Sequence, residues 1–429
     1  MSDLRVLDHI ARPMQRLGYL KRMTRRVTAM NTSNLENLGH DLIDTVTRKI
    51  RVKMNPQRAA YVKVRLMDRA YQTLKEQTNT YLANGVEPPE VSMELQDLYL
   101  ADPMITSGVG KLVRDDWRKY PALGINLGLI RSGTYSATTR ALSLMYLTPE
   151  LEQKAFLEYL PNSNPLLLSQ QQGLLLLYSC LENDGEAVMP LMRQLAAHSG
   201  LPNANPSGAT FSDRDAGNLL PEIYKAVIAR HRTRSLSADL RDRLAVLETS
   251  AESIARQRNI EGYSGGTARE HASRVRVEPY VDIGLLTKPD PYRYEYTMSP
   301  VGLRWATAFD DIDSSDAIED FLTKRFFSTA ATAWQIPAQP LTDQDEIVAH
   351  VQKAWKAINS PGGYAPIEEM GLVAGIEAML DHGLIIEIAA ARQALIDYQR
   401  ANPYAVRFTV DRMGVLAHAR FLEGSAVAP

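Results

Sequence analysis

The segment Ile283-Gly284-Leu285-Leu286 ends an apolar helical stretch with a glycine and leads into a short alternating segment, Tyr294-Glu295-Tyr296-Thr297. The same succession recurs twice more along the chain. One copy runs from Leu127-Gly128-Leu129-Ile130 to Thr134-Tyr135-Ser136, and the other from His382-Gly383-Leu384-Ile385 to Val406-Arg407-Phe408-Thr409. Glycine readily adopts the left-handed backbone that ends many helices, so each copy predicts a helix end followed by a strand.

After each alternating segment comes a turn or a basic residue and then another apolar group. This repeated unit of helix, glycine cap, strand, turn and helix resembles the winged helix, a small module that binds DNA or another protein. The pattern is most complete over residues 215–306. Three such units imply a mainly α fold with small β wings, built from tandem winged-helix-like modules and helical extensions.

Breaks in the pattern predict four parts, since 429 residues exceed one ordinary core. The clearest breakers are the proline-rich and glycine-rich stretches at 84–89 and 200–212 and the acidic connector at 310–316. The expected parts are a basic N-terminal helical region at 1–89, a winged-helix-like unit with a helical extension at 90–200, a central winged helix at 213–310, and a C-terminal helical and winged-helix-like region at 316–429.

Hydrophobic spacing and capping residues predict the individual elements. Ser169 is expected to cap a helix that buries Leu174 to Leu177, and Thr267 with Glu270 forms a capping-box pattern at the start of another. Pro279 is expected to end or kink that second helix. The other predicted helices span 4–30, 32–52, 56–84, 110–130, 219–231, 238–257, 316–334, 343–358, 367–380 and 388–401, and the predicted strands span 285–288, 292–298 and 404–410.

The central unit carries a helix whose residues fit DNA contact. In DNA-binding winged helices the third helix enters the major groove and the wing contacts the backbone. Here Arg269, Ser273 and Arg276 follow at helical spacing, beside an apolar stripe of Ala268, Ala272 and Val275. The candidate DNA contacts of this unit are therefore Arg269, Ser273, Arg274, Arg276, Lys288 and Arg293.

The N-terminal segment adds a second basic region. Residues 1–70 hold 15 Lys and Arg against 6 Asp and Glu, although the whole chain has a net charge of -2. Lys21, Arg22, Arg25 and Arg26 are its densest group and are candidate phosphate contacts. A solvated helical face or a surface for an acidic partner explains the same pattern.

The other two copies differ at the helix before the glycine. Residues 114–119 mix both charge signs, and the third copy has Glu368 and Glu369 where a DNA-reading helix needs basic residues. Carboxylates repel a polyanion, so these copies are expected to bind protein or to build the core.

No catalytic motif stands out, and we expect no cofactor, no metal and no enzymatic activity. Gly108-Val109-Gly110-Lys111 lacks both the upstream glycine and the hydroxyl residue of a phosphate-binding loop. The 8 histidines form no close ligand pair, and the single cysteine, Cys180, excludes an internal disulfide. With no apolar run of membrane-spanning length and no secretory signal, a cytoplasmic location without membrane contact is expected.

Two main hypotheses follow. The first is a non-enzymatic DNA-binding protein, associated with the nucleoid, in which the central unit contacts double-stranded DNA and the N-terminal segment adds backbone affinity. The second is a structural subunit whose winged helices join protein partners, similar to the kleisin linkers of chromosome-organising ATPases, or an accessory subunit of a bacterial defence system. Protein partners or a second copy fit either one. For the first, changing Arg269 and Arg276 to Glu is expected to abolish binding without changing melting.

Overall fold

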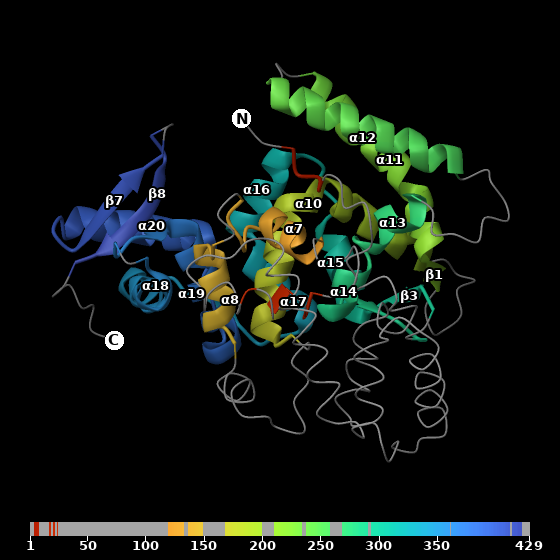
Figure 1. Ribbon diagram of the computed structural model, residues 1–429. Helices are drawn as coiled ribbons and strands as arrows, with labels where there is room; N and C mark the ends of the chain where they lie inside the picture. Colours follow the sequence, from red (N-terminus) through yellow and green to blue (C-terminus); the bar gives the residue numbers. More distant parts are fainter. Residues whose placement is uncertain are drawn as a thin grey trace, which may run out of the picture.

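The computed structural model describes residues 4–7, 17–18, 20–21, 24, 119–132, 136–148, 168–199, 210–233, 237–257, 268–290, 293–360, 362–411 and 414–422. Within these ranges the protein is mainly helical, with short strands arranged in small sheets, as expected. Figure 1 shows the C-terminal elements (blue) projecting from the helical body at the side away from the long paired helices α11 and α12 (green). The helices predicted over 32–52 and 56–84 lie outside the described residues.

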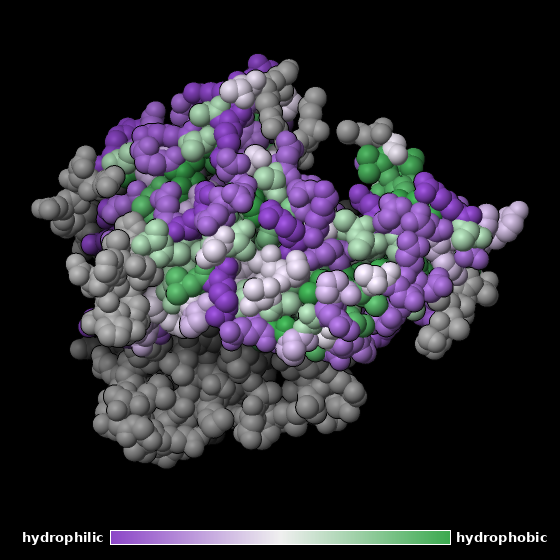
Figure 2. Space-filling model, turned by 180° about the vertical axis from the view of Figure 1, so that it is seen from behind, coloured by the Kyte–Doolittle hydropathy of each residue, from purple (hydrophilic) through white to green (hydrophobic). Residues whose placement is uncertain are grey.

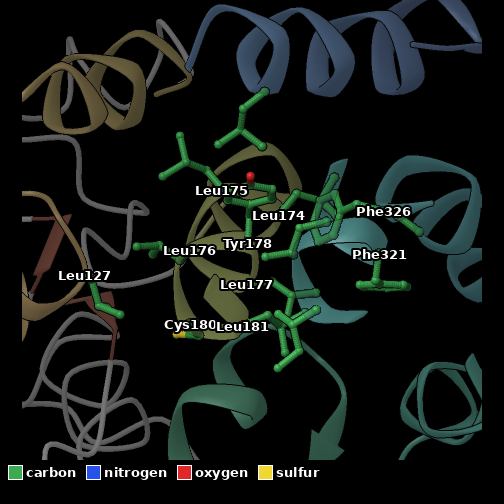
Figure 3. Close-up of a cluster of buried hydrophobic side chains, with 14 of the residues drawn as sticks. Leu127, Leu174, Leu175, Leu176, Leu177, Tyr178, Cys180, Leu181, Phe321 and Phe326 are labelled. Atoms are coloured by element: carbon green, nitrogen blue, oxygen red, sulfur yellow. The ribbon is translucent and has the colours of Figure 1, made fainter. Parts of the chain in front are cut away.

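Helix α10 (Gln170–Ser199) forms the centre of the body. Its predicted cap is confirmed, because the Gln172 amide donates to Ser169 Oγ at 3.2 Å and the Ser169 amide donates to Gln172 Oε1 at 3.0 Å. Leu174 to Leu177 are at most 1% exposed. In Figure 3, Leu174 and Leu177 lie on the side of Phe321 and Phe326, whereas Leu176 faces Leu127. One run of leucines therefore joins elements from three parts of the chain.

The central unit begins with the two predicted helices, α11 (Asp213–Arg232) and α12 (Ala238–Gln257). Two short helices follow, α13 (Ala268–Arg274) and α14 (Glu278–Asp282). Pro279 does not end a helix here. The chain leaves the helical conformation after Arg274, and Pro279 occupies the first turn of α14, where its missing amide hydrogen costs no bond.

A three-stranded antiparallel sheet closes this unit. It contains β1 (Phe211–Ser212), β2 (Leu286–Thr287) and β3 (Glu295–Met298) in the order β1-β3-β2. The two predicted wing strands are present but shorter than expected, with Leu286 opposite Met298. Helix α15 (Pro300–Ala308) follows directly, capped by Ser299.

The first two copies of the glycine step form the same local structure. The first consists of α7 (Lys119–Asn126), a bridge between Ile130 and Ala137, and α8 (Thr139–Tyr146). Gly128 and Gly284 both have positive φ, 71° and 84°. The hydroxyl that caps the next helix donates in each case to the carbonyl of the glycine, from Thr138 at 2.5 Å and from Ser299 at 2.7 Å. The two copies thus share the conformation of the glycine and the contact that the capping hydroxyl makes with it, while the strand predicted at 134–136 lies partly outside the described residues.

The C-terminal part starts with α16 (Ser315–Lys324) and α17 (Phe326–Trp334), which pack on α10 and α15. Trp305 of α15 contacts the rings of Phe321, Phe326 and Trp334. Because these rings come from both sides of the acidic connector at 310–316, the core is continuous across it.

The remaining elements form the projecting part. They are β4 (Gln339–Pro340), α18 (Gln344–Ile358), β5 (Ala365–Pro366), α19 (Ile367–His382), β6 (Leu384–Ile385), α20 (Ile388–Ala401), β7 (Val406–Val410) and β8 (Leu416–Phe421). Strands β5, β8 and β7 make an antiparallel sheet in that order, and β4 pairs with β6 in parallel. The third glycine, Gly383, has φ 67°, but its carbonyl accepts from the Gln339 amide of β4. The third copy therefore departs from the other two.

The N-terminal helix predicted over 4–30 is wrong for its first residues. Residues 4–7 are not helical, and they run between α10 and α12 with Leu4 and Val6 buried. The Leu7 amide donates to Asp184 Oδ1 at 2.9 Å, and Arg243 donates to the Leu4 carbonyl at 3.0 Å. These tertiary bonds replace the helical ones, which a local pattern cannot anticipate.

Candidate nucleic-acid interface

Side chains of the predicted basic face of the central unit point into the protein core. Arg276 is 3% exposed, lies beyond the end of α13, and donates to Asp184 Oδ1 at 2.8 Å. Ser273 is fully buried and donates to the Asp213 carbonyl at 2.6 Å. A side chain enclosed in this way does not reach the groove of a duplex.

The remaining basic residues of this unit have partners of their own. Arg274 forms an ion pair with Asp213 at 2.5 Å, and Lys288, whose side chain is 5% exposed, forms one with Glu278 at 2.8 Å. Arg269 is half-buried and donates to Asn218 Oδ1 at 3.1 Å. Only Arg293, with 69% of its side chain exposed, is presented to solvent, and it lies 3.3 Å from an oxygen of Asp290. The expected exposed basic face is not formed at these positions, because the protein's own carboxylates neutralise most of the charge.

The N-terminal candidates divide in the same way. Lys21 is 1% exposed and therefore belongs to the core. Arg22, Arg25 and Arg26 lie outside the described residues.

Glu368 and Glu369, at the start of α19, belong to a buried charged cluster that joins three helices. Arg140 of α8 forms ion pairs with Glu369, at 2.5 Å, and with Glu182 of α10. The hydroxyl of Tyr178, which also lies on α10 (Figure 3), donates to Glu368. The pKa of Glu368 is raised to about 7, mainly by burial and to a smaller extent by the nearby Glu182 carboxylate. These carboxylates thus stabilise contacts within the protein, in line with a core-building role for the third copy.

An exposed basic surface does occur, on the sheet of the C-terminal part. Arg407 of β7 lies directly opposite Arg420 of β8, and the next outward pair is Thr409 with His418. All four side chains are exposed, whereas the alternate residues Val406 and Phe421 are buried. We call these four residues, Arg407, Thr409, His418 and Arg420, the outer sheet face.

The two arginines of the outer sheet face lack a counter-charge among the described residues, where neither forms an ion pair with a carboxylate. The Arg420 guanidinium lies 5.9 Å from the ring centroid of Tyr364, a contact that leaves its charge in place. Like charges directly opposite each other across two strands are destabilising. Such a pair is an arrangement that an anionic ligand stabilises.

Exposed apolar side chains gather on the same part of the protein. Tyr404 is 89% exposed, Val410 59% and Val415 48%, and among the described residues the one other exposed large hydrophobic side chain is Leu303, at 39%. Figure 2 shows hydrophobic residues at the tip of the projecting part, next to a mainly hydrophilic surface. The C-terminal part therefore presents both charge and apolar area to a partner.

The sequence contained a signal for this surface that the glycine steps obscured. Residues 388–422 hold five arginines and two aspartates. Glu368 and Glu369 lie in the helix before the third glycine step, whereas these arginines follow that step. The alternation of Arg407, Phe408 and Thr409 also indicates a strand with one basic outward face.

His231 lies near a serine and a carboxylate, but these three residues do not form a nucleophilic site. His231 Nε2 lies 3.0 Å from Glu186 Oε1, and Ser315 Oγ donates to Glu186 Oε2 at 2.9 Å. Glu186 thus lies between the other two, whereas activation of a serine needs the histidine in the middle. In the part of the chain that the structure describes, no three His, Cys, Asp or Glu residues are placed to hold a metal ion.

None of the described helices has the length and apolarity that a membrane crossing requires. Cys180 is buried, which raises the pKa of its thiol to about 12 and keeps it protonated at neutral pH. Compared with known proteins, the chain matches no protein-family model, no curated protein and no solved structure.

Proposed function

We propose that the protein binds DNA without catalysing a reaction, and that the outer sheet face contacts the phosphate backbone. The observation that carries this proposal is the opposed pair Arg407 and Arg420, exposed and unpaired by any carboxylate of the described residues. Arginine binds phosphate through two parallel hydrogen bonds, and a phosphate group between two guanidinium groups relieves their repulsion.

The order of elements in the C-terminal part supports this assignment. In chain order these elements are helix α18, strand β5, helix α19, the two-residue strand β6, helix α20 and strands β7 and β8, and the sheet order is β5-β8-β7. Apart from β6, which pairs with β4, this succession and sheet order resemble those of a winged helix. Helix α20 then takes the place of the third helix, and it exposes Gln393 and Arg400.

The contrast with the central unit favours the same choice. Its sheet has the order β1-β3-β2, yet Arg274, Arg276 and Lys288 are bound by carboxylates. A DNA phosphate would have to displace those internal partners. At Arg407 and Arg420 no described carboxylate competes with it.

Binding of a mixed-sequence duplex across a salt series tests the proposal. Each lost phosphate contact lowers the slope of log affinity against log salt by about 0.9. Changing both Arg407 and Arg420 to Glu is expected to weaken binding and to lower the slope by about two units. The matched control changes Arg241 and Arg256 to Glu, since both lie exposed on α12 with an equal change of charge. Equal loss in the control, or none in the first variant, removes the assignment to the outer sheet face.

A linking subunit is the second candidate, because Tyr404, Val410 and Val415 expose apolar area. In that role the protein joins other subunits through the end of the β7–β8 hairpin, where Val410 and Val415 are exposed. Changing Val410 and Val415 to Asp would then detach a defined partner, whereas Arg407 and Arg420 would be dispensable. Measuring the partner's affinity for both double variants separates this role from DNA binding.

A further inference from the structure

Tyr404 is presented on a rigid turn between α20 and β7. The Asn402 amide donates to the Tyr398 carbonyl at 2.8 Å, and the Ala405 amide donates to the Asn402 carbonyl at 2.9 Å. Pro403 restricts the backbone between them, and the Leu422 amide donates to the Ala405 carbonyl at 2.9 Å. The chain thus holds a large aromatic ring in solvent at 89% exposure on a hydrogen-bonded backbone.

Basic side chains stand on both sides of this tyrosine. Arg400, in the last turn of α20, has 72% of its side chain exposed, and Arg407 is exposed on β7. Three residues of chain span at most about 11 Å, so Tyr404 lies within one or two nucleotides of the outer sheet face. Among the described residues, no ring stacks on Tyr404 and no cation lies over it.

An exposed ring beside exposed arginines is typical of a site that stacks on a nucleic-acid base. Paired bases in a duplex are already stacked on their neighbours, so their faces are closed to a side chain. An unpaired base offers its face freely, and its phosphates remain available to arginine. A tyrosine side chain has only two rotatable bonds before the hydroxyl, so it loses little conformational freedom on binding.

We propose that Tyr404 stacks on an unpaired base and that the preferred ligand is a duplex with an adjoining single-stranded segment. This preference rests on the DNA binding proposed above, in which the outer sheet face contacts the phosphates. Tyr404 adds the discrimination between tailed and blunt DNA. Arg400 neutralises the backbone next to the stacked base, in addition to its exposed contact with Asp397 at 3.2 Å.

The experiment measures the affinity of the full chain for two fluorescent probes, a blunt mixed-sequence duplex and the same duplex with a short single-stranded tail. We expect wild type to bind the tailed probe more tightly. Tyr404→Ala is expected to weaken binding of the tailed probe by about fivefold to 150-fold, the range for loss of one base–aromatic stack, and to leave the blunt probe unchanged. Tyr404→Trp keeps a stacking ring and is expected to retain the preference.

The outcomes separate this inference from DNA binding itself. If wild type binds both probes equally, or if Tyr404→Ala weakens both to the same extent, Tyr404 does not read an unpaired base although DNA binding stands. If wild type binds neither probe at low salt, the DNA-binding function fails and the stacking role with it. Because Tyr404 is exposed, a folding defect is not expected, and an unchanged melting temperature verifies this.

Discussion

Ser299 Oγ donates a hydrogen bond of 2.7 Å to the carbonyl oxygen of Gly284, while it accepts one of 2.9 Å from the Gly302 amide. One hydroxyl therefore closes the end of the glycine step and also caps α15. Thr138 has the same two roles, toward Gly128 and Ala141. The repeat is thus maintained by a specific side-chain contact as well as by a hydrophobic pattern.

Ser299→Ala is expected to lower the free energy of unfolding by about 1–2 kcal/mol, because a cap and a second hydrogen bond are lost at a buried residue. Chemical denaturation monitored by circular dichroism measures this. Ser299→Thr keeps the hydroxyl and is expected to retain most of the stability. If the alanine variant lost less than about 0.3 kcal/mol of unfolding free energy, the hydroxyl would not have this role.

Gly302 is required by its closeness to Leu285. A Cβ atom at Gly302 would lie 2.0 Å from the Leu285 carbonyl oxygen, inside van der Waals contact. Gly302→Ala is therefore expected to destabilise the fold by about 1–3 kcal/mol. Gly173 in α10 is the control, since a Cβ there meets nothing within 4 Å, and Gly173→Ala is expected to stabilise the helix by about 0.5–1 kcal/mol. Thermal melts test this contrast, because the melting temperature is expected to fall in Gly302→Ala and to rise in Gly173→Ala.

Arg276→Ala is expected to destabilise the protein by about 3–5 kcal/mol, because it leaves the Asp184 carboxylate buried without its partner. Arg293→Ala, at an exposed ion pair, is expected to change stability by less than about 0.5 kcal/mol. Comparison of the two denaturation curves checks this. Accordingly, we no longer expect Arg276→Glu to leave the melting temperature unchanged, because Arg276 is buried and stabilises the fold.

Stability is expected to depend on pH through Glu368. Its pKa in the folded protein is about 7, above the ordinary value of 4.5, so the folded state holds a proton that the unfolded state releases. The free energy of unfolding therefore falls as pH rises from about 4.5 to about 7 and then levels off with respect to this group. Arg140, Glu182, Glu369 and Tyr178 surround it.

Glu368→Gln tests this dependence, because glutamine resembles the protonated acid and still accepts a hydrogen bond from Tyr178. The variant is expected to be more stable than wild type at pH 8 and to lose this part of the pH slope. Urea denaturation at pH 5, 6, 7 and 8 measures the difference. Parallel pH profiles for the two proteins would contradict the assignment of the slope to Glu368.

Local signals in the sequence were sufficient for much of the fold. The cap at Ser169 and the positive φ of Gly128, Gly284 and Gly383 depend on residues within one or two turns. Helix α20 was predicted over the range that it occupies, since its apolar spacing and flanking residues lie within a single segment.

The candidate site depended on contacts between distant segments. Whether an arginine is free or neutralised is decided by residues far along the chain, as with Arg276 and Asp184, which are 92 positions apart. The register between β7 and β8 likewise places Arg407 opposite Arg420. The positions where helices begin and end, and the glycine steps, follow from short-range interactions that the sequence displays directly. The exposure and ion pairing of a side chain arise only when packing brings separate segments together.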